Sequence, residues 1–231
     1  MDDPRKKYEG SDLFDLRPDR DRQVPGQPGG KKAALIPQLD KIQRELEALS
    51  RQAQEVTHGL TEEQLNWRPF ANRWSIAECL AHLNLQGSEL LPTLDKAINQ
   101  ARNRSLFSWG PFKVSWLGRW FIKGTEPPVR WRRRSPERQV PPQGQSINVV
   151  LPGLLDLHRR ISDLMNGANG MDLSKIKVAP PGGPLISLNL LEMFMYLAAH
   201  ERRHIDQAWQ VRYHDNFPKK KATKHIIQTP T

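Results

Sequence analysis

The sequence predicts an all-α protein, an antiparallel four-helix bundle with a long connection between its second and third helices. Four segments repeat apolar residues at three- and four-residue steps, which is the spacing of one helix face. We find no convincing two-residue alternation of the kind that marks strands. The 231 residues are 37% hydrophobic and 26% charged, which suits one soluble domain with a single core. These observations together favour a helical bundle over a sheet-containing fold.

The first half of the chain contains a polar leader and two of the helices. Residues 1–30 are rich in Asp, Arg, Pro and Gly, so they bury too little apolar surface to offset their ordering entropy, and we expect disorder. The first helix is expected over residues 33–58. Ser75 and Glu78 match a capping box that opens the second helix, expected over residues 76–102.

The second half begins with the long connection. Residues 104–144 mix aromatics with glycine, proline and arginine, and we expect one short helix there, over residues 116–122. The third long helix is expected over residues 148–166, where Pro152 either starts it or kinks it. The fourth is expected over residues 190–213.

Caps and composition define the domain limits. Ser187 or Asn189 is expected to cap the fourth helix. We assign the folded domain to residues 31–215 and a basic, flexible tail to residues 216–231.

Charge and cysteine content limit the possible environment and partners. The formal net charge of +10 is concentrated in arginines of residues 130–138 and lysines of residues 219–224, so the remaining body is close to neutral. We find no apolar run long enough for a membrane span and no signal peptide. Because a single cysteine, Cys79, excludes an internal disulfide, we expect a reducing, cytoplasmic location.

Two histidines in the fourth helix form the strongest functional pattern. His200 and His204 are four residues apart, so they lie one above the other on one helix face. This spacing lets one helix offer two nitrogens to a single metal ion. Glu201 also points inward, and a buried charge needs a partner or a cation. The alternative is a pair of histidines that hydrogen-bond to their neighbours at the edge of the core.

A third ligand should come from another helix. His82 is the best candidate, although it lies roughly 120° from the centre of the apolar stripe of its helix. His158 is the rival, and its alternative role is to line the core or a pocket. Cys79 is expected to be a small core residue rather than a ligand.

Two carboxylates are candidate catalytic residues. Glu78 could act as a base near His82, or simply complete the capping box. Glu201 could orient a ligand histidine or pair with an arginine. The string His200-Glu201-x-x-His204 also matches a metalloprotease motif in which the glutamate is the general base. We disfavour that interpretation because no further ligand of the expected type follows, and no sheet precedes the motif to hold a peptide.

Three segments resemble the DinB-like family of four-helix proteins. They are GLTEEQLNWRP (residues 59–69), WSIAECLAHL (residues 74–83) and AHERRHIDQ (residues 199–207). The resemblance covers residues 33–213 and implies an up-down-down-up bundle with a three-histidine metal site. In this sequence the implied ligands are His82, His200 and His204. The family is often dimeric, so a homodimer is implied as well.

The resemblance also implies candidate activities on a small-molecule substrate. Relatives include S-transferases that use bacillithiol or mycothiol, so a low-molecular-weight thiol is an implied cofactor. Three imidazoles leave a position open on a divalent ion such as Zn, Ni or Fe. We therefore expect a thiol-dependent S-transferase or a metal-dependent hydrolase. The alternative is a metal-stabilised binding or stress-response module without turnover.

The aromatic and basic connection leaves three interpretations open. We expect its aromatic side chains, within residues 106–134, to fold back over the bundle and cover the mouth of the metal site. The others are contact with a membrane surface and stacking on single-stranded nucleic acid. We disfavour nucleic acid as a partner because the folded body is nearly neutral.

Overall fold

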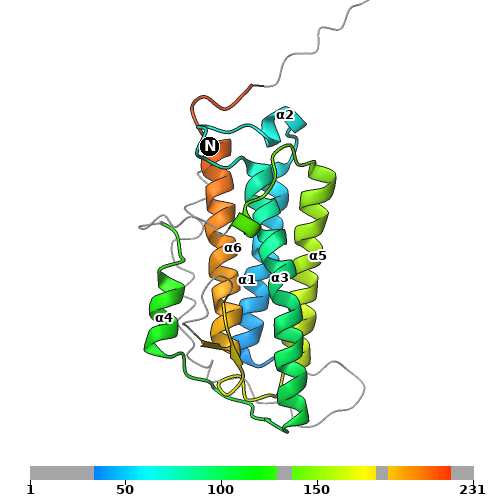
Figure 1. Ribbon diagram of the computed structural model, residues 1–231, viewed down its shortest axis with the longest axis vertical. Coiled ribbons are helices and arrows are strands. Elements are labelled where there is room, and N and C mark those ends of the chain that lie inside the picture. The colour runs from blue at the N-terminus through cyan, green and yellow to red at the C-terminus, as the bar shows by residue number, and fades with distance from the viewer. Residues whose placement is uncertain (1–33, 129–136, 181–186, 220–231) are drawn as a thin grey trace, which may run out of the picture.

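Four long helices form the body of the protein (Figure 1), in a computed structural model that describes residues 34–128, 137–180 and 187–219. The long helices are α1 (Pro37–Thr57), α3 (Ile76–Asn103), α5 (Ile147–Ala168) and α6 (Leu190–Arg212). In Figure 1, α1 and α6 run upward, whereas α3 and α5 run downward. The predicted all-α bundle is confirmed. The neighbours α3 and α5 run parallel because the connection between them returns the chain to the end where α3 begins.

The helix starts follow the local capping chemistry. The Ser75 side chain accepts a hydrogen bond from the Glu78 backbone N–H, and the Glu78 carboxylate accepts one from the Ser75 backbone N–H, so the predicted capping box opens α3. Asn189 caps α6 in the same way, with Glu192 as its partner. The prediction that Pro152 could start the third long helix is wrong. The Ser146 side chain caps the helix at its N-terminus. Pro152 therefore lies inside α5 and not at its start.

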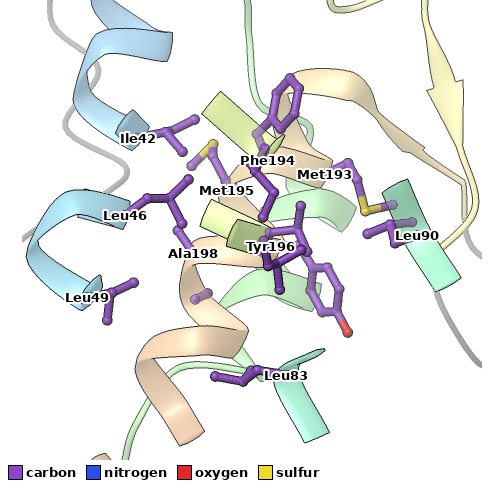
Figure 2. Close-up of a cluster of buried hydrophobic side chains, with 14 of the residues drawn as sticks. Ile42, Leu46, Leu49, Leu83, Leu90, Met193, Phe194, Met195, Tyr196 and Ala198 are labelled. Atoms are coloured by element: carbon purple, nitrogen blue, oxygen red, sulfur yellow. The ribbon is translucent and has the colours of Figure 1, made fainter. Parts of the chain in front are cut away.

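Helix α6 is the central helix of the structure. Every residue from Leu190 to Arg202 is buried, because α6 packs against α1, α3 and α4 (Trp116–Lys123). Figure 2 shows its apolar side chains between the α1 leucines on one side and Leu83 and Leu90 of α3 on the other. A helix that is covered on all sides can carry functional side chains away from solvent.

The segment between α3 and α5 closes the side of α6 that the other long helices leave open. Its described residues contain α4 and the 3₁₀ helix η2 (Glu137–Gln139). Gly118 of α4 lies so close to α6 that a β-carbon there would approach Glu192 Cδ to 2.5 Å. Two shorter features complete the described chain: α2 (Glu62–Leu65), and β1 (Lys177–Val178) paired antiparallel with β2 (Leu188–Asn189).

The three tryptophans of this connection that the structure describes do not cover the bundle as expected; Trp131 lies outside the described residues. Trp109, Trp116 and Trp120 are all exposed. The inward side of α4 is formed instead by residues such as Phe121 and Ile122. The alternation of aromatic and basic residues suggested a cover, but helical spacing places both tryptophans of α4 on the side away from α6.

Some expectations lie outside the described residues. They are the disorder of residues 1–30 and the flexibility of the tail beyond residue 219. Among the residues that are described, no helix combines the length and the apolar character needed to cross a membrane.

Candidate metal centre

The structure brings His82, His200 and His204 together from two helices. Each of the three rings offers one nitrogen, and these nitrogens lie within 4.8 Å of one another. His82 comes from α3, and the other two from successive turns of α6. The ring centroids of His82 and His204 are 4.6 Å apart, and those of His82 and His200 are 5.2 Å apart. Within the described ranges, these three residues form the one group of histidine, cysteine or carboxylate side chains arranged to hold a metal ion.

Hydrogen bonds orient two of the three rings. His82 Nδ1 lies 2.7 Å from the backbone oxygen of Gln139, which can only accept, so this nitrogen carries the proton and donates. His204 Nδ1 lies 3.1 Å from Oε1 of Gln207 and donates in the same way. In both rings Nε2 is therefore left with its lone pair, which is the form a metal ligand needs.

The distance between the two α6 histidines fits a shared ion. His200 Nε2 and His204 Nε2 are 3.2 Å apart. Two imidazole nitrogens that bind one zinc ion tetrahedrally at about 2.0–2.1 Å would be separated by about 3.3–3.4 Å. His200 Nδ1 is buried and has no hydrogen-bond partner in the described part of the protein. The three residues could therefore hold a divalent ion without rearrangement of the helices that carry them.

Burial and charge keep the three imidazoles neutral. Desolvation lowers the pKa of His82, and it lowers the pKa of His200 and His204 well below the ordinary value. The nearby Arg203 guanidinium lowers the pKa of all three rings further. Neutral imidazole is the form that binds metal, so the environment favours the metal-binding protonation state.

Side chains from several elements close over the cluster. Trp74, just before α3, lies against two of the rings, with centroid distances of 4.7 Å to His82 and 5.6 Å to His204. The Tyr196 ring lies 5.7 Å from the His200 ring, and its hydroxyl accepts a hydrogen bond from Gln86. Each of the three histidine rings therefore lies against an aromatic side chain.

Helix η2 contacts the cluster at the ring of His82. The Gln139 side chain donates to Glu89 of α3 over 2.7 Å, while its backbone oxygen accepts from His82. Arg138 forms an ion pair with the same Glu89. These contacts fix η2 on α3 directly above the ring of His82. Together with α6, whose His200 and His204 rings face His82, η2 buries His82 although it lies off the apolar stripe of its helix.

The candidate Glu78 does not reach the cluster of rings. Its carboxylate accepts from the Ser75 backbone N–H at 2.9 Å and from Arg68 Nε at 2.7 Å. The capping role considered from the sequence is therefore what the structure shows, with an added arginine ion pair. Cys79, next to it, is fully buried in the core, and burial raises the pKa of its thiol.

The candidate Glu201 also faces away from the cluster. Its carboxylate contacts His158 Nε2, and the other nitrogen of that ring contacts the Ser50 hydroxyl. His158 is therefore a buried core residue paired with Glu201, not a third ligand. Because its carboxylate contacts His158, Glu201 is not placed to act as the base of a metalloprotease motif.

Sequence reasoning missed several residues around the site. Tyr196 and Gln207 lie four residues before His200 and three after His204, so helical spacing could have placed both on the histidine face. Trp74 directly precedes the Ser75 cap of α3, and the sequence pattern does not show that its ring reaches the histidines. The Gln139 contact had no detectable signal, because a backbone oxygen leaves no trace in the residue pattern.

Comparison with known proteins agrees with this arrangement. Searches of curated proteins and of solved structures found no match. A family-level comparison matches residues 45–208 to the DinB superfamily. The matched region is more than half of the chain and includes all three histidines of the cluster. The chain belongs to the DinB superfamily.

Proposed function

We propose that this protein binds a divalent transition metal ion through His82, His200 and His204 and uses it to act on a small molecule. The observation that carries this proposal is the convergence of three buried neutral imidazoles from two helices. The donor set is compatible with zinc, nickel or iron.

The proposed reaction is thiol-dependent S-transfer or hydrolysis. A divalent ion held by three imidazoles keeps a further position and lowers the pKa of a thiol or water that occupies it. Gln139 and Gln207 hold the protons of two ligand rings at Nδ1, so that Nε2 stays available. The rings of Trp74 and Tyr196 lie against the histidines and help to keep bulk water from the cluster. No described carboxylate is close enough to join the cluster, so we do not assign Glu78 or Glu201 a catalytic role.

Elemental analysis tests the metal site. The wild-type protein should purify with, or take up, one divalent ion per chain, and His204→Ala should lose it. His58→Ala is the matched control, because His58 is exposed at the end of α1 and its loss should leave metal content unchanged. Equal metal content in wild type and His204→Ala would overturn the site.

A thiol panel tests the reaction. Metal-loaded wild type is incubated with an electrophilic halide and with bacillithiol, mycothiol or glutathione, and thioether formation is measured. We expect turnover with at least one thiol and none with His204→Ala. Inactivity of the metal-loaded protein with all three thiols would remove the transferase proposal and leave hydrolysis to be tested separately.

The burial of the cluster favours a second candidate, a metal-stabilised binding module without turnover. His82, His200 and His204 are only 2%, 8% and 6% exposed, so a substrate would need Trp74 or η2 to move. Cobalt-substituted protein distinguishes the two candidates. A visible spectrum that changes on addition of thiol supports an accessible ion and hence an enzyme, whereas an unchanged spectrum supports the module.

A further inference from the structure

Helix α4 presents two tryptophans and two cations on a single outward face. Trp116, Arg119, Trp120 and Lys123 follow the spacing i, i+3, i+4, i+7, so they share one side of the helix. All four are exposed, and the two tryptophans remain 80% and 53% accessible. We name these four residues the α4 outer face.

The opposite side of α4 is fixed to the bundle. Ile122 is fully buried, and the Phe121 ring lies 5.3 Å from that of Tyr196. At the start of the helix, the Ser115 backbone N–H donates to Glu192 Oε1 over 2.7 Å. Just beyond its end, Glu126 forms an ion pair with the buried Arg202 of α6. Because α4 is held at both ends, it cannot turn its tryptophans inward.

The segment that carries this face has charge of one sign in its sequence. From Arg104 to Thr125 the chain contains four cations and no Asp or Glu. Two acidic residues that hold α4 on the bundle, Glu126 and Glu192, contact Arg202 and backbone N–H groups. Exposed tryptophans within a basic, acid-free stretch are complementary to an anionic surface that also accepts apolar rings.

We propose that the α4 outer face docks the protein on anionic lipid membranes. Tryptophan is suited to the headgroup level of a bilayer, because its ring is apolar and its indole N–H can hydrogen-bond. Arg119 and Lys123 lie beside the rings, where they can meet lipid phosphates. Eight residues of helix measure about 12 Å, so α4 would lie along the surface rather than enter the bilayer.

The same observations disfavour two other occupants. A second copy of the chain, paired about a two-fold axis through this face, would place Arg119 and Lys123 against their own counterparts. A single-stranded nucleic acid is usually bound in a basic groove that follows its backbone. The α4 outer face is instead the convex side of one short helix at the edge of the bundle (Figure 1), a shape that meets a flat surface.

Vesicle co-sedimentation of the full-length protein tests the proposal. The protein is mixed with vesicles of phosphatidylcholine alone or of phosphatidylcholine with phosphatidylserine. We expect binding to the mixed vesicles only, with quenching of tryptophan fluorescence when the lipids are brominated. The double variant Trp116→Ser/Trp120→Ser keeps every charge and should lose most of the binding and quenching. Arg119→Gln/Lys123→Gln should weaken binding about fivefold per residue removed.

Matched controls separate this face from other basic or aromatic parts of the chain. Trp109→Ser removes an exposed tryptophan outside α4, and Arg51→Gln/Arg160→Gln removes two exposed cations from α1 and α5. Both controls should bind like wild type, and circular dichroism should show every variant folded. Undiminished binding by the two α4 variants would assign the interaction to another region and overturn the proposal.

The remaining outcomes also decide against lipid. Absence of binding to the mixed vesicles by wild type overturns the proposal directly. If a single-stranded oligonucleotide binds wild type but not Trp116→Ser/Trp120→Ser, and vesicles do not bind, the face recognises nucleic acid. If sedimentation velocity shows that this variant dissociates an oligomer, and vesicles do not bind, the face is a contact between copies.

Discussion

Two buried histidine sites share helix α6, and they are built on opposite principles. In one, His158 lies between the Glu201 carboxylate and the Ser50 hydroxyl. In the other, His200 and His204 face His82, and no described carboxylate joins them. Adjacent residues of a helix diverge by about 100°, so α6 can direct His200 and Glu201 to different sites.

The difference between the two sites concerns how each balances charge. A buried histidine with a carboxylate and a hydroxyl has partners for both ring nitrogens, so that site joins α1, α5 and α6 without any ligand. The three-histidine cluster has three lone-pair donors and neighbouring groups that lower their pKa. Buried nitrogen lone pairs with no neighbouring acid gain a partner when a cation binds between them. The first site therefore stabilises the fold, and the second is suited to bind a metal ion.

The largest predicted effect tests the structural side of this comparison. Glu201→Ala should lower the free energy of unfolding by about 3–5 kcal/mol, because it leaves His158 buried without its carboxylate. Chemical denaturation of metal-free protein measures this. Asp156→Ala, which removes an exposed partner of Arg159 on α5, is the control and should cost at most about 1 kcal/mol.

A second variant separates structure from catalysis at the same position. Glu201→Gln keeps the shape of the side chain but removes its charge. If it left stability unchanged and abolished turnover, Glu201 would be a catalytic base and the assigned contrast between the two sites would fail.

Metal addition should stabilise the protein through the other site. With free zinc at about a thousandfold excess over its dissociation constant, the free energy of unfolding of wild type should rise by about 4 kcal/mol. His200→Ala should show no comparable gain, whereas Ser50→Ala should respond like wild type. An equal gain in wild type and His200→Ala would place the bound ion elsewhere.

The metal-free protein should lose stability in acid because of the cluster. The folded pKa values of His82, His200 and His204 are lowered, so below about pH 6.5 the unfolded chain binds more protons than the folded one. Each ring then lowers the free energy of unfolding by at most about 1.4 kcal/mol per pH unit, until the pH falls below the folded pKa of that ring. Thermal unfolding between pH 7.5 and 5.5, with His204→Ala beside wild type, should show the shallower dependence in the variant. Parallel curves would argue against neutral buried rings.

The smallest effect concerns the hydrogen bond that orients one ligand. Gln207→Ala removes the acceptor of His204 Nδ1 and should weaken metal affinity about 10- to 100-fold. Gln210→Ala is the matched control, because the exposed Gln210 donates to Asp206 and not to a ligand ring. Competition with a chromogenic chelator measures both. Equal affinities would show that the ring is oriented without this contact.

Local patterns in the sequence were sufficient to predict the helices and part of the site. Apolar spacing predicted all four long helices, and capping residues placed the starts of α3 and α6. The spacing of His200 and His204 depends only on helix geometry, so their shared face followed directly. These features are local, and local chemistry determines them.

The features that failed to follow from the sequence depend on contacts between distant segments. A helical wheel assumes one buried face, which made His82 look misplaced. Helix α3 packs against both α5 and α6, and η2 and Trp74 also contact His82, so more than one face of α3 is buried. A single apolar stripe does not indicate this. The outward direction of the α4 tryptophans likewise depends on which side of α4 meets α6. Gly118 lies on that side and allows the close approach to Glu192.

X-ray absorption of the zinc-loaded protein tests the central claim most directly, because it counts the imidazole ligands around the ion. We predict three imidazole nitrogens at about 2.0–2.1 Å in wild type and two in His82→Ala loaded with zinc. An identical spectrum from wild type and His82→Ala, or a wild-type ion with fewer than three imidazoles, would contradict the account.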